Sequence, residues 1–261
     1  MRPASKHQRQ GDLFAKRKRR ARKGKKLGRP RNNPARAGSP HKRRPEHKKR
    51  FPVHVVLRVH KGVGSLRKRF MYRALREATI AVALRELAYD DVNGAFRIVH
   101  LSIQRTHVHL LVEADNRLAL SRGMQSFQIS AAKHINREYS VKAKLTERRR
   151  GNVFVDRFHQ EVIKTPRQAR RSLAYVLNNW RKHREDEYDF AKNWPIDPFS
   201  SAFSFDGWKE REDAIVRWPK RATYDPLIVY FPKTWLLLQG WQRHGLISFY
   251  EVPSRPGLPT A

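Results

Sequence analysis

Alternation of hydrophobic and polar residues predicts four β-strands in the middle of this chain. The alternation first appears over residues 53–60, where every second side chain is aliphatic. Two further apolar runs, 96–103 and 107–113, are separated only by the link 104–106, which indicates a hairpin. Residues 152–163 are again rich in β-forming residues and predict a fourth strand.

Apolar residues at helical spacing predict three helices between and after these strands. Ser65 is a plausible N-cap for a long helix that extends to about residue 87. A second helix is expected over 117–139. Thr165-Pro166 combines an N-cap with a proline at the first helical position, so a third helix should run from there to about His183.

The resulting order, β-α-β-β-α-β-α, predicts an α+β fold of the ferredoxin-like, split βαβ kind. Such a fold has an antiparallel sheet with helices on one face, and we expect the other face to be open and the third helix to be an addition. The domain should cover residues 51–190. A Trp- and Pro-rich extension, 191–261, follows it, and a disordered basic arm, 1–50, precedes it.

Charge narrows the class of partner. The chain has 57 Lys and Arg against 23 Asp and Glu, a net charge of +34, and 21 of the basic residues lie in the arm. A surface this basic is typical of proteins that bind nucleic acids, and the arm should grip phosphates without choosing a sequence. Charge alone does not separate DNA from RNA, or an enzyme from a binding protein.

The sequence also excludes several classes of chemistry. It has no cysteine, which rules out disulfides, thiolate metal sites and a cysteine nucleophile. No stretch of the sequence reaches 18 apolar residues, so no membrane span is expected. The basic N-terminus is not followed by the apolar segment that a secretory signal requires. By elimination we expect a cytoplasmic, nucleoid-associated protein.

Two histidines on one predicted strand form the first candidate site. His107 and His109 are two residues apart, so both imidazoles point to the same face while Val108 points to the other. Paired imidazoles on a rigid strand can bind a divalent metal. The same pattern also fits two solvated histidines on an open sheet face.

The third predicted helix carries the second candidate. Tyr175 and Asn179 are four residues apart and therefore share one helical face. A tyrosine beside a metal-polarised phosphate can act as a nucleophile, and the Asn179 carbonyl oxygen could be a third metal ligand. Alternatively, Tyr175 is an aromatic residue of the core.

These segments together resemble a known family. The run 107–113, His-Val-His followed by Leu-Leu-Val-Glu, resembles the HUH motif, and segments 152–159, 165–167 and 175–179 are similar to those of single-tyrosine transposases. Within the HUH endonuclease superfamily, the chain looks closest to the REP-associated tyrosine transposases. The resemblance covers roughly residues 50–205, and Trp180 stands where many relatives have proline.

The resemblance implies a function and a set of roles. His107, His109 and Asn179 would bind Mg²⁺ or Mn²⁺, and Tyr175 would cut single-stranded DNA through a 5′-phosphotyrosine intermediate. The expected partner is single-stranded DNA with a hairpin, and the protein would act as a monomer or homodimer. Basic residues near the hairpin and the second helix are expected to contact phosphates: Arg105, Lys133, Arg137, Lys142, Lys144, Arg148, Arg149 and Arg150.

Two other functions fit the same residues. A transposase-derived nucleic-acid-binding protein would have lost catalysis, and a metal phosphoesterase would use water as nucleophile, with Tyr175 incidental. A covalent protein–DNA adduct separates these possibilities, because only the tyrosine mechanism produces one.

Overall fold

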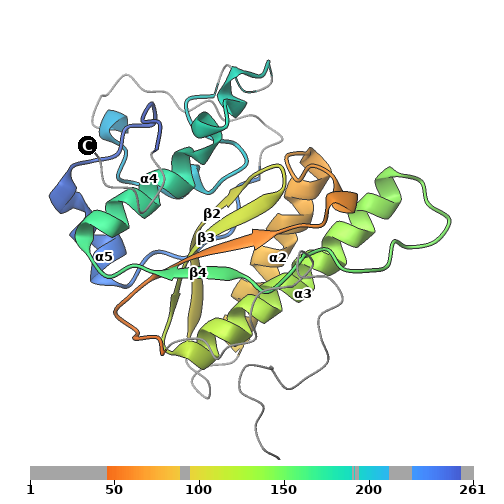
Figure 1. The fold of residues 1–261 in the computed structure, drawn as a ribbon, viewed down its shortest axis with the longest axis horizontal. Helices are drawn as coiled ribbons and strands as arrows, with labels where there is room; N and C mark the ends of the chain where they lie inside the picture. Colours follow the sequence, from red (N-terminus) through yellow and green to blue (C-terminus); the bar gives the residue numbers. More distant parts are fainter. Residues whose placement is uncertain (1–45, 89–94, 190, 192–193, 212–224, 254–261) are drawn as a thin grey trace, which may run out of the picture. The chain divides into compact units, whose positions relative to one another are not determined.

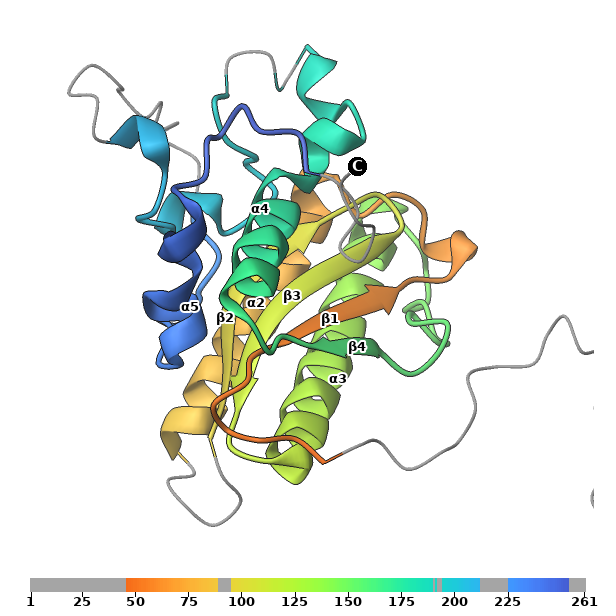
Figure 2. The ribbon, with the colours of Figure 1, turned by 60° about the vertical axis from the view of Figure 1, so that its left-hand side comes forward.

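A computed structural model of the chain describes residues 46–88, 95–189, 191, 194–211 and 225–253. The basic arm expected over 1–50 therefore lies almost wholly outside the described residues. The fold is built on one antiparallel sheet with helices on both faces (Figures 1 and 2). None of the described helices is long and apolar enough to cross a membrane.

The sheet contains four strands in the order β2-β3-β1-β4: β1 (Val53–Arg58), β2 (Phe96–Ile103), β3 (His107–Ala114) and β4 (His159–Val162). All neighbouring strands are antiparallel, which is the arrangement of the ferredoxin-like fold. Strands β2 and β3 form the hairpin that the short link predicted. The fourth strand is shorter than the β-rich segment 152–163, because its first part contributes only a bridge between Val59 and Phe154.

Two long helices cover one face of this sheet and form its main core. Helix α2 (Arg69–Ala88) packs on α3 (Arg117–Lys142), and both pack on the aliphatic side chains of the strands. Val108, Leu110 and Val112 of β3 belong to this core, as strand parity predicted. Helix α2 begins three residues later than an N-cap at Ser65 would give, because the Ser65 hydroxyl accepts the Arg67 N–H in a turn before the helix.

Helix α4 (Pro166–Lys182) lies on the opposite face, as Figure 2 shows. Its N-terminus is a capping box: Thr165 accepts from the Gln168 N–H, and the Gln168 side chain accepts from the Thr165 N–H. Leu173 and Leu177 of this helix pack in a second core with Val99 of β2 and with β3. The expectation of an open face is therefore wrong over β2 and β3.

Described parts of the Trp- and Pro-rich extension complete this second core. Trp208, Leu236, Leu237 and Trp241 pack there, next to helix α5 (Trp235–Leu238) and the 3-10 helix Gly240–His244. Other short 3-10 helices are Lys61–Val63, Glu185–Glu187, Ala202–Ser204 and Lys209–Arg211. The segment after α4 thus folds back and holds that helix against the sheet.

Candidate active site

The imidazoles of His107 and His109 lie side by side at the start of β3. Their Nε2 atoms are 2.9 Å apart, and their ring planes are almost perpendicular. His109 is buried and His107 is half-buried, and both project toward the face that carries α4. Strand parity accounts for this shared direction.

Each of these two rings has a partner for its other nitrogen. His109 Nδ1 lies 3.0 Å from Nε2 of His54 on β1, and His107 Nδ1 lies 3.2 Å from the Thr106 hydroxyl. If each Nδ1 carries the proton and donates it to that partner, both Nε2 lone pairs are free and face each other. Two lone pairs 2.9 Å apart repel unless a proton or a cation lies between them.

Burial keeps these histidines neutral. Loss of hydration lowers the pKa of His54 and of His107 to about 4, and it holds the pKa of His109 well below its ordinary value. Neighbouring positive groups lower them further, Lys182 and His183 among them for His109. Neutral imidazole is the metal-binding form, so these residues are ready to act as ligands at neutral pH.

Tyr175 meets the histidines across the gap between α4 and the sheet. Its ring centroid is 5.2 Å from that of His109 and 5.8 Å from that of His54, edge to face in both cases. Lys182, almost two helical turns further along α4, places its Nζ 5.0 Å from the centroid of the Tyr175 ring. The structure therefore brings together residues from β1, β3 and α4 that are more than 120 positions apart at the extremes.

Asn179 is fully buried one helical turn after Tyr175. Neither its amide oxygen nor its amide nitrogen has a hydrogen-bond partner among the described residues. An amide buried in this way costs free energy unless a further group pairs with it. This is the state expected of a side chain whose ligand is added on binding.

The two Nε2 atoms and the Asn179 amide oxygen form a donor set that fits a divalent metal. Histidine and carboxylate groups alone would not complete such a site. Two ligands at right angles, each about 2.1 Å from one ion, lie about 3 Å apart, which matches the separation of the two Nε2 atoms. In the described parts of the chain, no three His, Asp or Glu side chains converge on one point. An amide such as that of Asn179 is therefore the kind of third ligand that this site needs.

Two site residues were missed or undervalued in the sequence. His54 looked like an ordinary strand histidine, and only the pairing of β1 with β3 places it behind His109. His183 follows Tyr175 by eight residues, and its ring centroid is 6.2 Å from that of His107. The spacing of 175, 179 and 183, the last being the C-cap of α4, is the signal that could have identified His183.

The predicted DNA-binding residues divide into two groups. Arg105 lies in the hairpin beside the histidines, where it pairs with Glu185 at 2.5 Å and stacks on Tyr188. The others lie on the second half of α3 or in the loop after it: Lys133, Arg137, Lys142, Lys144, Arg148, Arg149 and Arg150.

This second group, which we call the α3 basic cluster, is almost entirely exposed. Arg148 and Arg149 are held in place by the Lys133 carbonyl and by the side chains of Asn136 and Tyr139. Helix α3 covers the face of the sheet opposite α4, so the cluster is not on the face that carries the histidines (Figure 2). A strand of DNA would have to pass around the sheet edge to touch both.

Three further residues on or near these elements are buried. Glu113, on the same strand as His107 and His109, is fully buried, pairs with Arg97 and accepts the backbone N–H of Lys233. Trp180 and Trp194 are both buried in one small apolar cluster, so neither is available to stack on a base.

Comparison with known proteins gives one family match. The family model described as "Transposase IS200 like" matches residues 49–179, half of the chain, and spans β1 through the Tyr175 helix. A solved structure described as "Structure of the REP associates tyrosine transposase bound to a REP hairpin" is 16% identical, with a TM-score of 0.44. The match covers 75% of this chain and 100% of that one. No curated protein matches the sequence.

Proposed function

This chain belongs to the IS200-like transposase family, and from that premise we propose that it cuts and rejoins single-stranded DNA through Tyr175. The observation that carries the proposal is the position of the Tyr175 ring, 5.2 Å from that of His109. A nucleophile, paired metal-binding imidazoles and a buried amide meet at one place. This combination suits phosphoryl transfer far better than it suits nucleic-acid binding alone.

In the cutting step, Tyr175 Oη attacks the phosphorus of one phosphodiester. A P–O bond to tyrosine forms as the bond to the 3′ oxygen breaks, which leaves a 5′-phosphotyrosine and a 3′-hydroxyl. The phenol gives up its proton and the departing 3′ oxygen gains one, so the step is balanced. Lys182 favours the developing phenolate, because its positive charge lies over the ring.

Joining is the reverse reaction with a different strand. A 3′-hydroxyl attacks the phosphotyrosine, the new phosphodiester forms and Tyr175 is released. The energy of the broken phosphodiester is kept in the protein–DNA bond, so joining requires no nucleotide cofactor.

His107, His109 and Asn179 would hold Mg²⁺ or Mn²⁺ in this site. When bound, the ion supplies positive charge to a non-bridging phosphate oxygen and orients the phosphate for attack. His54 and Thr106 would favour the tautomers with a free Nε2 lone pair if they accept the Nδ1 protons of the two imidazoles. The chain's own contribution is thus a rigid, neutral pair of nitrogen ligands facing the tyrosine helix.

The α3 basic cluster and Arg105 would bind the DNA backbone. Exposed Lys and Arg give affinity without sequence choice, because phosphates are the same at every position. Arg105 would have to exchange Glu185 for phosphate, whereas Lys142 and Lys144 project freely into solvent.

Covalent capture of DNA is the direct test. The full-length protein should be incubated with 5′-labelled and 3′-labelled single-stranded DNA that contains a hairpin, with Mg²⁺ or Mn²⁺. A labelled adduct that maps to Tyr175 by peptide mass spectrometry is expected only when the label lies 3′ of the cut. In Tyr175→Phe the adduct should disappear while DNA affinity stays within about twofold, since one hydroxyl adds little to backbone binding.

Tyr188→Phe is the matched control, because Tyr188 is an exposed tyrosine just after the same helix. It should form the adduct normally. Cleavage that persists without an adduct would indicate water as nucleophile. Binding without any cleavage, across several hairpin substrates, would indicate a silent DNA-binding protein; either result overturns the proposal.

A further inference from the structure

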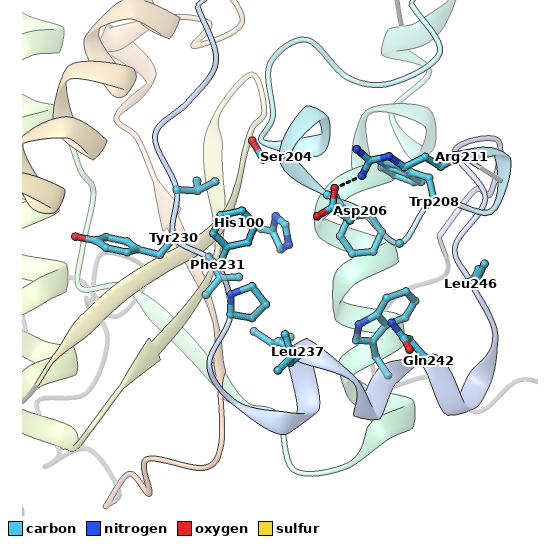
Figure 3. A pocket seen from close by; sticks show the side chains of 17 residues that line it. His100, Ser204, Asp206, Trp208, Arg211, Tyr230, Phe231, Leu237, Gln242 and Leu246 are labelled. Carbon is cyan, nitrogen blue, oxygen red and sulfur yellow. Dashed lines mark hydrogen bonds and ion pairs between the residues drawn. The ribbon is translucent and has the colours of Figure 1, made fainter. Parts of the chain in front are cut away.

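A cavity of 580 Å³ lies over β2, between the sheet and the segments that follow α4 (Figure 3). Val99 and His100 of β2 lie at its floor, and its walls come from 204–211 and 229–246. Strand β2 is at the edge of the sheet, whereas Tyr175 faces His54 on β1, two strands away. Strands are spaced about 4.8 Å apart, so the cavity lies about 10 Å across the sheet from the tyrosine site.

Aromatic rings form one wall of the cavity. Phe205 is at the centre of this wall, with ring centroids 5.1 Å from Trp208, 5.4 Å from Trp241 and 5.5 Å from His100. Gly207 makes the packing possible, since a Cβ there would lie 2.3 Å from the Trp241 ring. The wall is rigid and apolar, which suits a flat aromatic ligand.

His100 lies at the floor of the cavity, where its ring nitrogens can form hydrogen bonds. The Ser201 hydroxyl oxygen accepts the Leu101 N–H at 3.0 Å and lies 3.2 Å from His100 Nδ1. Burial lowers the pKa of His100 to about 4, so the ring is neutral. With the Ser201 proton directed to Nδ1, the remaining proton of His100 is on Nε2 and can meet a ligand acceptor.

The rim of the cavity combines an exposed aromatic ring with charged and polar groups. Phe231 is 80% exposed, which is costly for an aromatic residue that no described part of the chain covers. Arg211, paired with Asp206, and exposed Gln242 lie at the same mouth. A ligand with an aromatic body and a negatively charged attachment would satisfy both kinds of group.

We propose that this cavity holds one unpaired base of the DNA strand, a few nucleotides from the phosphate that Tyr175 attacks. Such a base would stack against Phe231 and the aromatic wall, hydrogen-bond through its edge to His100, and leave its phosphate near Arg211. The net charge of +34 favours a polyanionic ligand over a neutral one. The inference rests on the proposed function for the DNA ligand and for the position of the attacked phosphate.

An abasic scan tests the proposal. Affinity of the full-length protein is measured for a set of hairpin-bearing single strands, each with one abasic site at a different unpaired position. We expect one position at which base removal weakens binding about tenfold, the loss typical of one stacked base. Phe231→Ala should weaken binding of the intact strand to a similar degree. The variant should bind the intact strand and that abasic strand with equal affinity.

Two further variants make the result specific. Gln242→Trp fills the mouth of the cavity from an exposed position and should weaken binding as Phe231→Ala does. Phe231→Trp keeps an aromatic ring at the rim and should retain binding. Leu87→Ala is the matched control, because Leu87 is 72% exposed on α2 and does not line the cavity. Circular dichroism should be unchanged in all four variants.

The outcomes are separable from those of the adduct experiment. If the Tyr175 adduct forms but no abasic position is coupled to Phe231, the base pocket is wrong and the proposed chemistry stands. If the coupling appears without an adduct, the pocket is supported and the chemistry fails. The proposal would also be overturned if free deoxynucleoside monophosphates bind in the cavity while no abasic position of the strand is coupled to Phe231.

Discussion

His107 and His109 point the same way because they are two residues apart on a strand, but their chemistry depends on what lies behind each ring. His54 lies 3.0 Å from the Nδ1 of His109, and Thr106 lies 3.2 Å from that of His107. These contacts orient both rings with Nε2 forward. At the scale of single residues, the site is therefore a pair of neighbouring imidazoles, proposed here as metal ligands, with a supporting residue for each.

This arrangement predicts a graded loss of metal binding. His109→Ala removes a ligand and should abolish measurable Mn²⁺ binding in isothermal titration. His54→Ala removes only the orienting hydrogen bond, so affinity should fall by about 10- to 100-fold, as for other outer-shell partners. His60→Ala, at an exposed histidine two residues beyond β1, should have no effect.

The third ligand is tested in the same titration. If Asn179 completes the site, Asn179→Ala should weaken Mn²⁺ binding far more than His183→Ala. The reverse order would assign the role to His183, whose ring is 6.2 Å from that of His107. If His109→Ala and the parent protein bind Mn²⁺ equally well, the metal does not bind at this site.

At the scale of elements, α4 matters most to the proposed chemistry, because its docking decides where Tyr175 lies. The helix begins at a capping box and buries Leu173 and Leu177 against β2 and β3. Segments after the helix then cover it, and the buried Glu113 carboxylate holds one of them through the backbone N–H groups of Lys233 and Thr234. The extension thus stabilises the position of the helix that carries Tyr175.

Removing the cap should destabilise the protein without changing its chemistry. Thr165→Ala loses the hydrogen bond to the Gln168 N–H, which is worth about 1 kcal/mol in comparable helices. For a chain of this size that corresponds to a decrease in Tm of about 2–4 °C. Differential scanning calorimetry measures the shift, which Thr165→Ser should largely recover.

Adduct formation at 20 °C should survive this change, since the capping residue does not touch the site. An undiminished Tm in Thr165→Ala would show that the packing of α4, rather than its capping box, fixes the start of the helix.

At the scale of the whole molecule, the basic cluster and the proposed active site lie on different surfaces. The histidines and Tyr175 lie on the α4 face, whereas the α3 basic cluster lies on the helix that covers the other face. DNA that reaches both must curve around the sheet. Backbone affinity and cutting should therefore be separable by mutation.

Salt dependence measures the contribution of the cluster. Alanine replacement of Arg148, Arg149 and Arg150 should reduce the slope of log affinity against log salt by up to about 2, because each lost phosphate contact on single-stranded DNA contributes about 0.7. Adduct formation at saturating DNA should be unchanged. The control is an equal loss of charge at exposed positions around the start of α2: Lys68, Arg69 and Arg73.

An identical reduction in both triple variants would mean that net charge alone, and not the cluster, binds the DNA.

Sequence alone determined the features that depend on neighbours along the chain. Strand parity placed His107 and His109 on one face, and the Thr165-Pro166 pair located the start of α4 at the correct residue. The strand and helix order specified the α+β fold, because each element's hydrophobic period is local. The net charge of +34 indicated a polyanionic partner without any structure.

Tertiary structure decided everything that depends on docking and register. Pairing of β1 with β3 placed His54 behind His109, and packing of α4 on the sheet brought Tyr175 to both. The same packing closed the face that was expected to be open and formed the cavity over β2. Such contacts join residues far apart in sequence, and only the combined fit of whole surfaces selects them, so no local pattern could have specified them.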